Sequence, residues 1–560
     1  MGNDEPEIYC ICPPSPELLK KIHNTKEKLA KGEKLPSSTN EDTLCFASFA
    51  PIIGRPRKTR AHTFERMPSQ VSSAGTLKVL VILVDFADKQ GNESIQHYED
   101  MLFSSNTFPT KSMQEYFEEV SGGKLSITGE IFGWYRMPQN LTYYANNNNG
   151  TGDTYPRNAR KLVEDAIIAA NADVNYSDYD NDGDGMVDAI FIIHAGQGAE
   201  VTANPNDIWS HRWAIRPMVL DGVQIRDYTI EPEDGRIGVF SHELTHVFGI
   251  PDLYDTDNSS MGIGDWCLMA GGSWNNNGRT PAHPSAWVKK KLGWINPVNL
   301  MTDKISVSLK DVENSQGRTY RLWTNGVQGK EYFLIENRQK KGFDSYLQGK
   351  GLLIFHIDEN MISNSDEDHY LVALEQADGQ KRLEKNLSRG DIGDPYPGST
   401  NNSKFDANSN PSNQSYSGAD TKVSITNIRE ENEIVTCDIS VGVGMELPQV
   451  VKTFLDTKIQ VVNKTTSDIL TRYKIINSIP DLFAEREHGI TNQFVTTIGY
   501  EDRFGRPESD GDYIDIILEI SHTMDIVNSA RGVQLGGDDI EVFVNGVTTG
   551  LLTKTKEIPL

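Results

Sequence analysis

One stretch limits the possible folds of this chain more than any other feature. Residues 238–255 read GVFSHELTHVFGIPDLYD, and two histidines in it, His242 and His246, are four positions apart. Side chains at positions i and i+4 share one face of an α-helix, so a helix here directs both imidazoles to the same point. Gly249 can end that helix with a positive φ, and Pro251 cannot continue it. The stretch therefore predicts a helix followed by a sharp turn.

These residues have the chemistry of a zinc-hydrolase site. His242 and His246 are the expected zinc ligands, and Glu243 reaches a water molecule on the ion without binding the ion itself. Zinc lowers the pKa of its bound water to about 7, so the glutamate takes the proton as the water attacks a carbonyl. The turn swings Asp252 back as the third protein ligand. The spacing His-Glu-x-x-His-x-x-Gly-x-x-Asp matches that of the metzincins, with aspartate in place of the usual third histidine.

A second part of the metzincin pattern follows downstream. Residues 265–275, DWCLMAGGSWN, place Met269 before two glycines and 17 positions after Asp252. Metzincins have a tight turn with a methionine beneath the zinc, so Met269 is expected to form this Met-turn. Cys267 is expected to be a buried apolar group rather than a nucleophile. Tyr254, two residues after the third ligand, is a candidate to stabilise an oxyanion.

An aspartate-rich loop lies before a predicted strand. It reads SDYDNDGDGMVDAI and resembles an Asp-x-Asp-x-Asp-Gly loop, in which alternating carboxylates bind one hard cation. It is not a full EF-hand, because the bidentate glutamate is missing and a strand follows. Crowded carboxylates repel one another without a cation, so the loop predicts structural Ca²⁺ rather than a solvated acidic turn. The expected ligands are the side chains of Asp178, Asp180, Asp182, Asp184 and Asp188 and the backbone carbonyl of Met186.

The pattern of the sequence changes along its 560 residues, which are too many for one core. In residues 71–297, buried strands such as Val79–Val84 alternate with helices, which predicts an α/β catalytic domain. Short alternating strands follow in residues 298–445 and 446–560, which predicts two β-rich, sandwich-like domains. Residues 1–70 are expected to be a separate N-terminal segment.

The N-terminal segment has the features of a propeptide. A short charged helix, SPELLKKIHNTKEKLAKGEK, precedes the basic stretch RPRKTR at residues 55–60. This stretch is either a solvated linker or a site for a trypsin-like protease. Cys10 and Cys12 lie close together near the start, and a thiolate is a strong ligand for zinc. The segment is expected to hold the enzyme inactive until it is cut away, through a thiol, a carboxylate or its bulk.

Composition excludes several classes of protein. The net charge of −25 argues against nucleic-acid binding as the main role, and no apolar run approaches the roughly 18 residues of a membrane helix. Five cysteines do not make a disulfide framework. The first residues are acidic and lack the apolar core of a signal peptide, so a removed signal, another export route and a cytosolic location all stay open.

Two further histidines are weaker candidates for the site. His211 lies between two tryptophans in DIWSHRWAI, where it is either part of a cleft wall or part of the core. His356 lies in a predicted strand, GLLIFHIDE, and is expected to be a hydrogen-bonded structural residue.

The sequence resembles the immune inhibitor A family of secreted bacterial metallopeptidases over about residues 75 to 440. The motifs that carry the resemblance are SHELTHVFGIPDLYD, YDNDGDGMVDAIFIIHAG, IWSHRW, LMAGGSW and PSAWVKKKLGW, with EYFEEVSGGKLSITGEIFGWY and GLLIFHIDEN. The resemblance implies zinc-dependent cleavage of protein substrates, calcium-supported structure, an N-terminal propeptide, secretion and a role in virulence. The missing signal peptide and the Cys10/Cys12 pair depart from the family.

Two other functions stay open. A binding or adhesion protein derived from an inactive peptidase would normally have lost Glu243 or a zinc ligand, and none of these residues is missing. A delivered toxin protease that acts inside cells is the second alternative, because the first residues do not have the pattern of a signal peptide.

Overall fold

The computed structural model describes residues 10–30, 71–152, 154–313 and 317–442, together with strands between Ile459 and Pro559. The basic stretch at residues 55–60 lies outside the described residues. No helix in the part of the chain that the structure describes is both long enough and apolar enough to cross a membrane.

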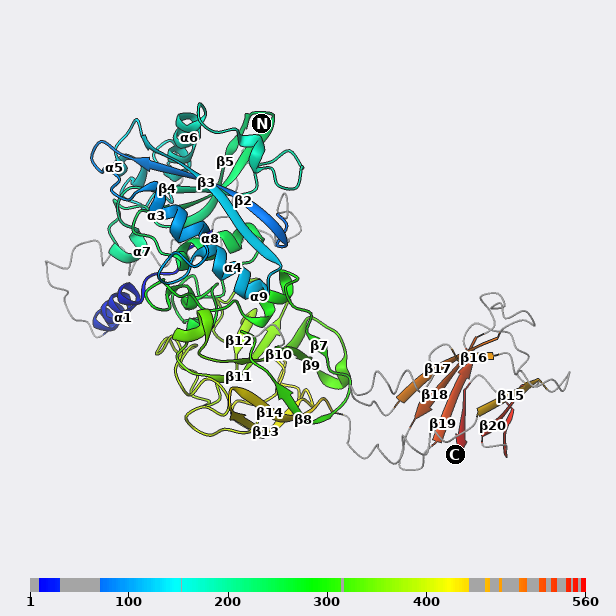
Figure 1. Cartoon of the computed structure of the whole chain (residues 1–560). Helices are drawn as coiled ribbons and strands as arrows, with labels where there is room; N and C mark the ends of the chain where they lie inside the picture. Colours follow the sequence, from blue (N-terminus) through cyan, green and yellow to red (C-terminus); the bar gives the residue numbers. More distant parts are fainter. Residues whose placement is uncertain are drawn as a thin grey trace.

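A six-stranded mixed sheet forms the centre of the first part of the chain (Figure 1). Its strand order is β1-β5-β6-β4-β2-β3, in which β3, β2, β4 and β6 run parallel while β5 and β1 are antiparallel to their neighbours. The sheet confirms the α/β prediction. Its strands are β1 (Cys10–Ile11), β2 (Gly75–Asp85), β3 (Leu125–Arg136), β4 (Ile190–His194), β5 (His211–Leu220) and β6 (Val223–Pro232).

Helices and short helical turns accompany this sheet, and α4, α8 and α6 are among those that cover its two faces. They are α1 (Pro16–Ala30), α3 (Ile95–Tyr98), η2 (Glu99–Phe103), α4 (Met113–Ser121), α5 (Leu141–Ala145), α6 (Ala159–Ala170), η3 (Tyr176–Tyr179), α7 (Ala199–Thr202), α8 (Ile237–Val247), η4 (Gly264–Trp266), η5 (Gly271–Trp274) and α9 (Ala286–Lys291). Helix α4 shows how closely the local sequence determines these elements. Ser112 and Glu115 form a capping box at its start, and Gly122 ends it with φ 66°.

Strand β2 is buried on both faces, as its continuous apolar run predicts. Val79, Val81 and Leu83 pack in the same cluster as α4 and α8. Leu80 and Ile82 point to the opposite face and pack against α6. Because successive side chains of a strand point to opposite faces, a strand covered on both sides needs apolar residues at every position.

Two antiparallel-rich sheets follow, which confirms the predicted change to β structure. One has the order β12-β11-β10-β9-β7 and the other the order β13-β14-β8. Their elements are β7 (Val298–Asn299), β8 (Lys304–Leu309), β9 (Tyr320–Leu322), η6 (Thr324–Gly326), β10 (Glu331–Arg338), η7 (Gly342–Tyr346), β11 (Gly351–Asp358), β12 (Val372–Leu374), β13 (Ser424–Glu431) and β14 (Ile434–Ser440).

The last strands form two more antiparallel sheets, with orders β15-β20-β21 and β16-β17-β18-β19-β22. Their sandwich arrangement and the four domain boundaries stay predictions. The strands are β15 (Ile459–Asn463), β16 (Tyr473–Ile475), β17 (Gln493–Tyr500), β18 (Tyr513–Glu519), β19 (Asp525–Ala530), β20 (Ile540–Val544), β21 (Val547–Leu551) and β22 (Thr555–Pro559).

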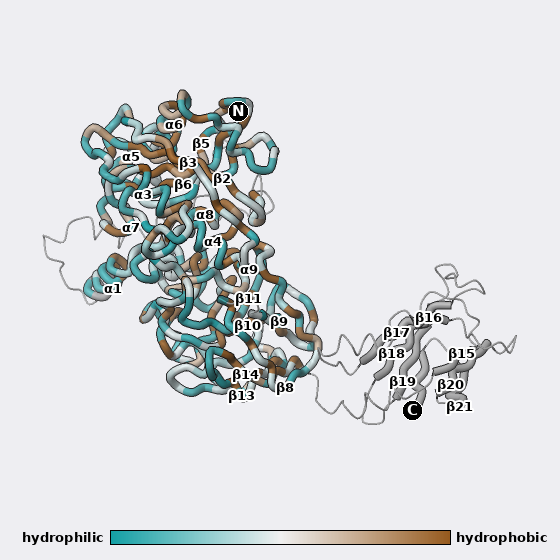
Figure 2. The backbone as a smooth tube through the Cα atoms, viewed as in Figure 1, coloured by the Kyte–Doolittle hydropathy of each residue, from teal (hydrophilic) through white to brown (hydrophobic). Residues whose placement is uncertain are grey.

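The α/β part and the first β-rich sheet share one hydrophobic core. Leu334 of β10, Phe355 of β11 and Val372 of β12 belong to the same buried cluster as Leu244 of α8 and Met269. In Figure 2 the hydrophobic colour gathers on strands of both parts, whereas α1 is mainly hydrophilic. The β-rich sheet therefore packs against the loops that follow α8 and supports them.

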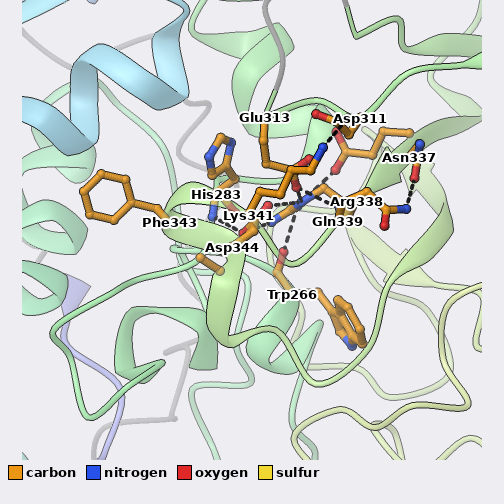
Figure 3. Close-up of polar contacts among 12 residues, drawn as sticks. Trp266, His283, Asp311, Glu313, Asn337, Arg338, Gln339, Lys341, Phe343 and Asp344 are labelled. Carbon is orange, nitrogen blue, oxygen red and sulfur yellow. Dashed lines mark hydrogen bonds and ion pairs between the residues drawn. The ribbon is translucent and has the colours of Figure 1, made fainter. Parts of the chain in front are cut away.

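A buried arginine joins the two parts through polar contacts (Figure 3). The guanidinium of Arg338, at the end of β10, donates to both carboxylate oxygens of Asp344 over 2.6 Å. It also donates to the backbone carbonyls of Trp266 and His283, each over 3.3 Å. Burial raises the pKa of Asp344, but Arg338 outweighs that effect and holds the pKa below its usual value. The pair is thus charged, and its bonds connect the β-rich sheet to the chain around the predicted Met-turn.

Candidate active site

Helix α8 carries the first site residues and ends where the sequence predicts. It spans Ile237–Val247, and its side chains are buried. Phe248 closes its last turn, and Gly249 follows with φ 81°. The N–H of Gly249 donates to the carbonyl of His246 over 2.9 Å. Glycine adopts this left-handed backbone conformation without steric cost. The chain reverses its direction here, which brings Asp252 back beside the helix.

Three side-chain atoms converge after this turn. The Nε2 atoms of His242 and His246 lie 3.1 Å apart. Oδ1 of Asp252 lies 3.1 Å from the first nitrogen and 3.2 Å from the second. A tetrahedral zinc ion with bonds of about 2.0–2.1 Å keeps neighbouring nitrogen and oxygen ligands about 3.3 Å apart. The three atoms thus have the separation that one such ion requires.

Backbone carbonyls determine the tautomer of both histidines. Nδ1 of His242 donates to the carbonyl of Leu268 over 3.0 Å, and Nδ1 of His246 donates to that of Ile250 over 2.7 Å. Because a carbonyl only accepts, each Nε2 presents a lone pair. Oδ1 of Asp252 is buried and receives no hydrogen bond from the described residues. Two lone pairs and a carboxylate oxygen therefore face one another, which is unfavourable without a cation.

The protonation states also suit metal ligands. Burial lowers the pKa of His246, although Asp252 opposes this effect, so the imidazole is neutral near pH 7. Burial raises the pKa of Asp252, whereas the protonated forms of His246 and His242 would outweigh that effect and lower this pKa below its usual value. Neutral histidines and an ionised carboxylate are the forms that bind metal ions.

Glu243 lies beside the first histidine on the same helix and is fully buried. Neither of its carboxylate oxygens has a hydrogen-bond partner among the described residues. Burial raises the pKa of Glu243 well above its usual value, and the carboxylates of Glu231 and Asp252 raise it further. A cation at the neighbouring ligands would oppose that increase. An unpartnered carboxylate at this position is suited to accept a proton from water.

The turn around Met269 is connected to the loop that carries Asp252. Met269 is fully buried, and its carbonyl accepts a hydrogen bond of 2.7 Å from the N–H of Leu253. The N–H of Ala270 donates to the carbonyl of Cys267 over 3.0 Å, which makes the turn tight. Cys267 is buried, and its sulfur accepts a hydrogen bond from a backbone N–H, in agreement with the prediction that it is not a nucleophile.

An N-terminal strand lies along the edge of the central sheet at this site. In β1, Cys10 pairs with Arg212 and Ile11 pairs with His211, antiparallel to β5. The N–H of Cys12 continues the ladder by donating to a backbone carbonyl over 3.0 Å. Residues that are about 200 positions apart in the chain therefore form the edge of the sheet together.

Three aromatic side chains bind the backbone of this N-terminal segment. The hydroxyl of Tyr254 donates to the carbonyl of Ile11, Trp209 Nε1 to that of Cys12, and Trp274 Nε1 to that of Pro13, each over 2.7 Å. The ring centroid of Tyr254 lies 6.3 Å from that of His242. Tyr254, which the sequence predicts as a candidate oxyanion stabiliser, thus binds a carbonyl beside the candidate metal ligands.

Several contacts of the site cannot be predicted from the sequence. The carbonyls of Leu268 and Ile250 act through the backbone, so their side chains give no signal. Trp209 and Trp274 contact the N-terminal segment only because distant parts of the chain fold together. The motifs IWSHRW and LMAGGSW contain both tryptophans and are the only signal in the sequence for them.

The aspartate-rich loop brings three of its predicted ligands together. Carboxylate oxygens of Asp180, Asp182 and Asp184 lie within 4.8 Å of one another. Oδ1 of Asp180 accepts from the N–H groups of Gly183 and Asp184 over 2.9 and 3.1 Å. Asp188 is buried next to this group, and one of its oxygens has no partner among the described residues. Burial raises the pKa of Asp188 to about 6, and Asp182 and Asp184 add to the increase.

Of the two other predicted ligands of this loop, Asp178 lies outside that group and Met186 contacts one of its members through its backbone. Asp178 is on η3, where its carboxylate accepts a hydrogen bond of 2.9 Å from the side chain of Asn175. It is not in the group of converging carboxylates, because the 3₁₀ turn directs it elsewhere. The backbone of Met186 forms a bridge to Gln224, and its N–H donates to Asp184 over 2.8 Å.

His211 and His356 belong to the packed interior. His211 is fully buried between the carbonyl of Trp209 and the hydroxyl of Tyr228, and burial lowers its pKa to about 4. His356 lies between two glutamates, whose oxygens are 3.0 and 3.2 Å from its ring nitrogens. The second histidine is therefore the hydrogen-bonded structural residue that the sequence predicts.

Comparison with known proteins gives a family for this region. Residues 67–295 match the family model described as immune inhibitor A peptidase M6, catalytic domain. Immune inhibitor A of Bacillus thuringiensis subsp. alesti is 33% identical over 289 residues, which are 41% of this chain and 42% of that protein. Pre-pro-metalloprotease PrtV of Vibrio cholerae serotype O1 is 32% identical over 312 residues, which are 45% of this chain and 33% of that protein. The chain spans less than half the length of these relatives. Residues 67–295 of this chain are therefore similar to the catalytic domain of the immune inhibitor A peptidase M6 family.

Proposed function

We propose that this chain is a zinc-dependent endopeptidase that hydrolyses peptide bonds of protein substrates. One observation carries the proposal: the ligand atoms of His242, His246 and Asp252 converge at 3.1–3.2 Å with their lone pairs facing one another. The buried carboxylate of Glu243 lies on the same helix and has no hydrogen-bond partner among the described residues. The similarity of residues 67–295 to the peptidase M6 family agrees with this chemistry.

The residues of the chain divide the reaction among them. His242, His246 and Asp252 would hold a zinc ion, which supplies an acidic water molecule and polarises the scissile carbonyl. Glu243 would accept a proton from the attacking water and deliver it to the leaving amine. Tyr254 donates its hydroxyl to a carbonyl of the bound chain, as it does to Ile11.

The edge of β5 is the proposed binding surface for the substrate. An extended peptide can pair with an exposed sheet edge through its backbone, whatever its sequence. Ile11 and Cys12 already pair with this edge, beside the metal ligands. In the proposed function they occupy the place of a substrate, and residues 10–30 act as an inhibitory propeptide.

Removal of this segment is the experiment that tests the function. Trypsin should cut the folded chain in the basic stretch at residues 55–60. Casein cleavage should then rise at least about tenfold, because the edge of β5 becomes free to pair with substrate once the N-terminal segment has left. Chelation should abolish the activity and added zinc should restore it. Equal activity before and after the cut would contradict latency, and no activity in either form would contradict the proposed function.

A variant that weakens the contact between α1 and the catalytic region tests whether release of the N-terminal segment activates the chain without a cut. Leu18 and Ile22 of α1 are buried against the catalytic region, whereas Lys20 between them is exposed. Leu18→Asp/Ile22→Asp should therefore activate the uncut chain, because burying two carboxylates opposes docking. Lys20→Asp, on the same helix, is the matched control and should leave the uncut chain latent.

Calcium binding at the aspartate-rich loop is part of the proposal. The support is the convergence of Asp180, Asp182 and Asp184 beside a buried Asp188 that has one unpartnered oxygen. A bound cation would offset the repulsion among these carboxylates and connect the loop to the start of β4. The cation is proposed to stabilise the fold rather than to take part in hydrolysis.

Calcium removal should therefore lower the melting temperature. A ligand that binds only the folded state stabilises it by RT ln(1 + [L]/Kd), about 2.7 kcal/mol at 100-fold excess over Kd. A calcium-selective chelator should reduce the melting temperature of the zinc-loaded chain, and Asp182→Ala should remove this calcium dependence. Asp178→Ala, outside the converging group, is the control. An unchanged melting temperature on chelation would make the loop a solvated acidic turn.

Secretion and a role in virulence stay predictions from the family resemblance. The intact set of His242, Glu243, His246 and Asp252 favours an active peptidase over a binding protein that has lost activity.

A further inference from the structure

We propose that the sulfur of Cys10 is the fourth ligand of the zinc ion in the uncut chain. The proposal deepens the proposed function, because it assigns the group that keeps the peptidase latent. The sulfur of Cys10 and the ligand atoms of His246 and Asp252 lie within 4.8 Å of one another. A thiolate is a strong zinc ligand, and tetrahedral zinc needs one ligand beyond the three that α8 and its following turn provide.

The distances agree with a shared ion. Zinc–sulfur bonds of about 2.3 Å and zinc–nitrogen or zinc–oxygen bonds of about 2.1 Å place a sulfur about 3.6 Å from its neighbouring ligands. The observed upper bound of 4.8 Å between the sulfur and the ligand atoms of His246 and Asp252 leaves at most about 1.2 Å to be closed toward each of these two atoms. Rotation about the Cα–Cβ bond of a single cysteine moves its sulfur by more than this distance.

The backbone of the segment is held independently of the thiol. Cys10 and Ile11 pair with β5, and the carbonyl of Ile11 accepts the hydroxyl of Tyr254 over 2.7 Å. Trp209 binds the next carbonyl over the same distance. These bonds place the Cα of Cys10 beside the site without help from a metal ion. The sulfur is therefore presented to the ion by a preformed strand, which reduces the entropy lost on coordination.

A second observation points to a ligand at this position. Glu243 is fully buried with both carboxylate oxygens unpartnered among the described residues, and Oδ1 of Asp252 is unpartnered as well. Such groups remain buried at low cost only when a cation lies close to them. Cys10 lies beside two of the three ligand atoms, those of His246 and Asp252.

Cys12 has a different environment, although it is only two residues away. Its side chain is fully buried and packs in a small apolar cluster with Val239 of α8 and Trp274. It is not in the group of converging ligand atoms. The two cysteines therefore have separate roles: Cys10 binds the ion, and Cys12 fills an apolar pocket beside it.

Coordination explains latency chemically. The thiol loses its proton to solvent as the sulfur–zinc bond forms, and the sulfur then occupies the position that the attacking water needs. When the segment leaves, the sulfur–zinc bond breaks and a water molecule takes the vacated position. Glu243 then has a proton donor next to it.

X-ray absorption at the zinc edge tests the proposal on the uncut, zinc-loaded chain. Wild type and Cys12→Ser should each show one zinc–sulfur distance of about 2.3 Å, and Cys10→Ser should show only nitrogen and oxygen ligands. The two variants are matched, since they make the same change in the same segment. Circular dichroism of each variant confirms that it is folded before the spectrum is recorded.

The outcomes separate this proposal from the proposed function. A wild-type spectrum with bound zinc and no sulfur would overturn the assignment of Cys10 and leave the peptidase intact. Loss of the sulfur distance in Cys12→Ser instead of Cys10→Ser would also overturn it, because the wrong thiol would be the ligand. Absence of bound zinc in the folded chain would contradict the proposed function itself.

Discussion

Replacing Glu243 with glutamine should lower casein hydrolysis by the trimmed chain about 10²- to 10⁴-fold while the zinc content stays unchanged. Glutamine keeps the size and shape of the side chain but cannot accept the proton of the attacking water. The residue is fully buried and is not among the three converging ligands, so the change should leave the metal site complete. Zinc analysis and initial rates on the same preparation measure both quantities.

Glu231→Gln is the matched control for this prediction. Glu231, on β6, is also fully buried, and its carboxylate oxygens have no partner among the described residues. It therefore reports the cost of removing a buried carboxyl group near the site without removing the proposed base. We expect its rate to fall less than about tenfold. Near-normal hydrolysis by Glu243→Gln, or equal losses in both variants, would contradict the role of Glu243 as general base.

Asp252→Ala should weaken zinc binding by more than about 100-fold. Loss of a group that only orients a metal ligand commonly costs 10- to 100-fold in affinity, and Asp252 is proposed to bind the ion directly. The substitution removes one of three protein ligands and leaves the two histidines, whose Nε2 atoms are 3.1 Å apart. Competition with a chromogenic chelator measures the affinity, and hydrolysis by the trimmed variant should fall in parallel.

The neighbouring aspartates serve differently as controls. The carboxylate of Asp255 is buried and accepts hydrogen bonds from Ser259 and Ser260, so its removal would leave buried donors unpaired and disturb the fold. Asp257 is less buried and accepts from one backbone N–H. Asp257→Ala is therefore the better control and should retain zinc. Zinc loss in Asp257→Ala but not in Asp252→Ala would show that the chain reversal after Gly249 presents a different ligand.

Local sequence patterns predict the elements of the site because they act over a few residues. The spacing of His242 and His246 requires only one helical turn, and Gly249 requires only its own φ. The continuous apolar run in β2 predicts burial on two faces for the same reason. These parts of the fold and site are therefore readable without knowledge of any distant contact.

The aspartate-rich loop shows where a pattern becomes insufficient. Alternation correctly groups Asp180, Asp182 and Asp184, which lie on one short turn. Asp178 has the same spacing in sequence but lies on a 3₁₀ turn and binds Asn175. Regular spacing predicts that side chains converge only where the backbone keeps one conformation. The backbone changes from the 3₁₀ turn η3 to the loop after Asp178, so the spacing does not predict the position of this carboxylate.

The sequence by itself determined the chemistry of this protein: two histidines, a glutamate and an aspartate arranged by one helix and one turn. Tertiary structure alone decided how the site is completed. It selected Cys10 rather than Cys12 to lie next to His246 and Asp252, and it aligned the N-terminal strand with β5. Both depend on packing between segments about 200 residues apart, whose entropy cost is recovered only through many simultaneous contacts. A pattern of neighbouring residues contains no record of such contacts, so they become visible only in the folded chain.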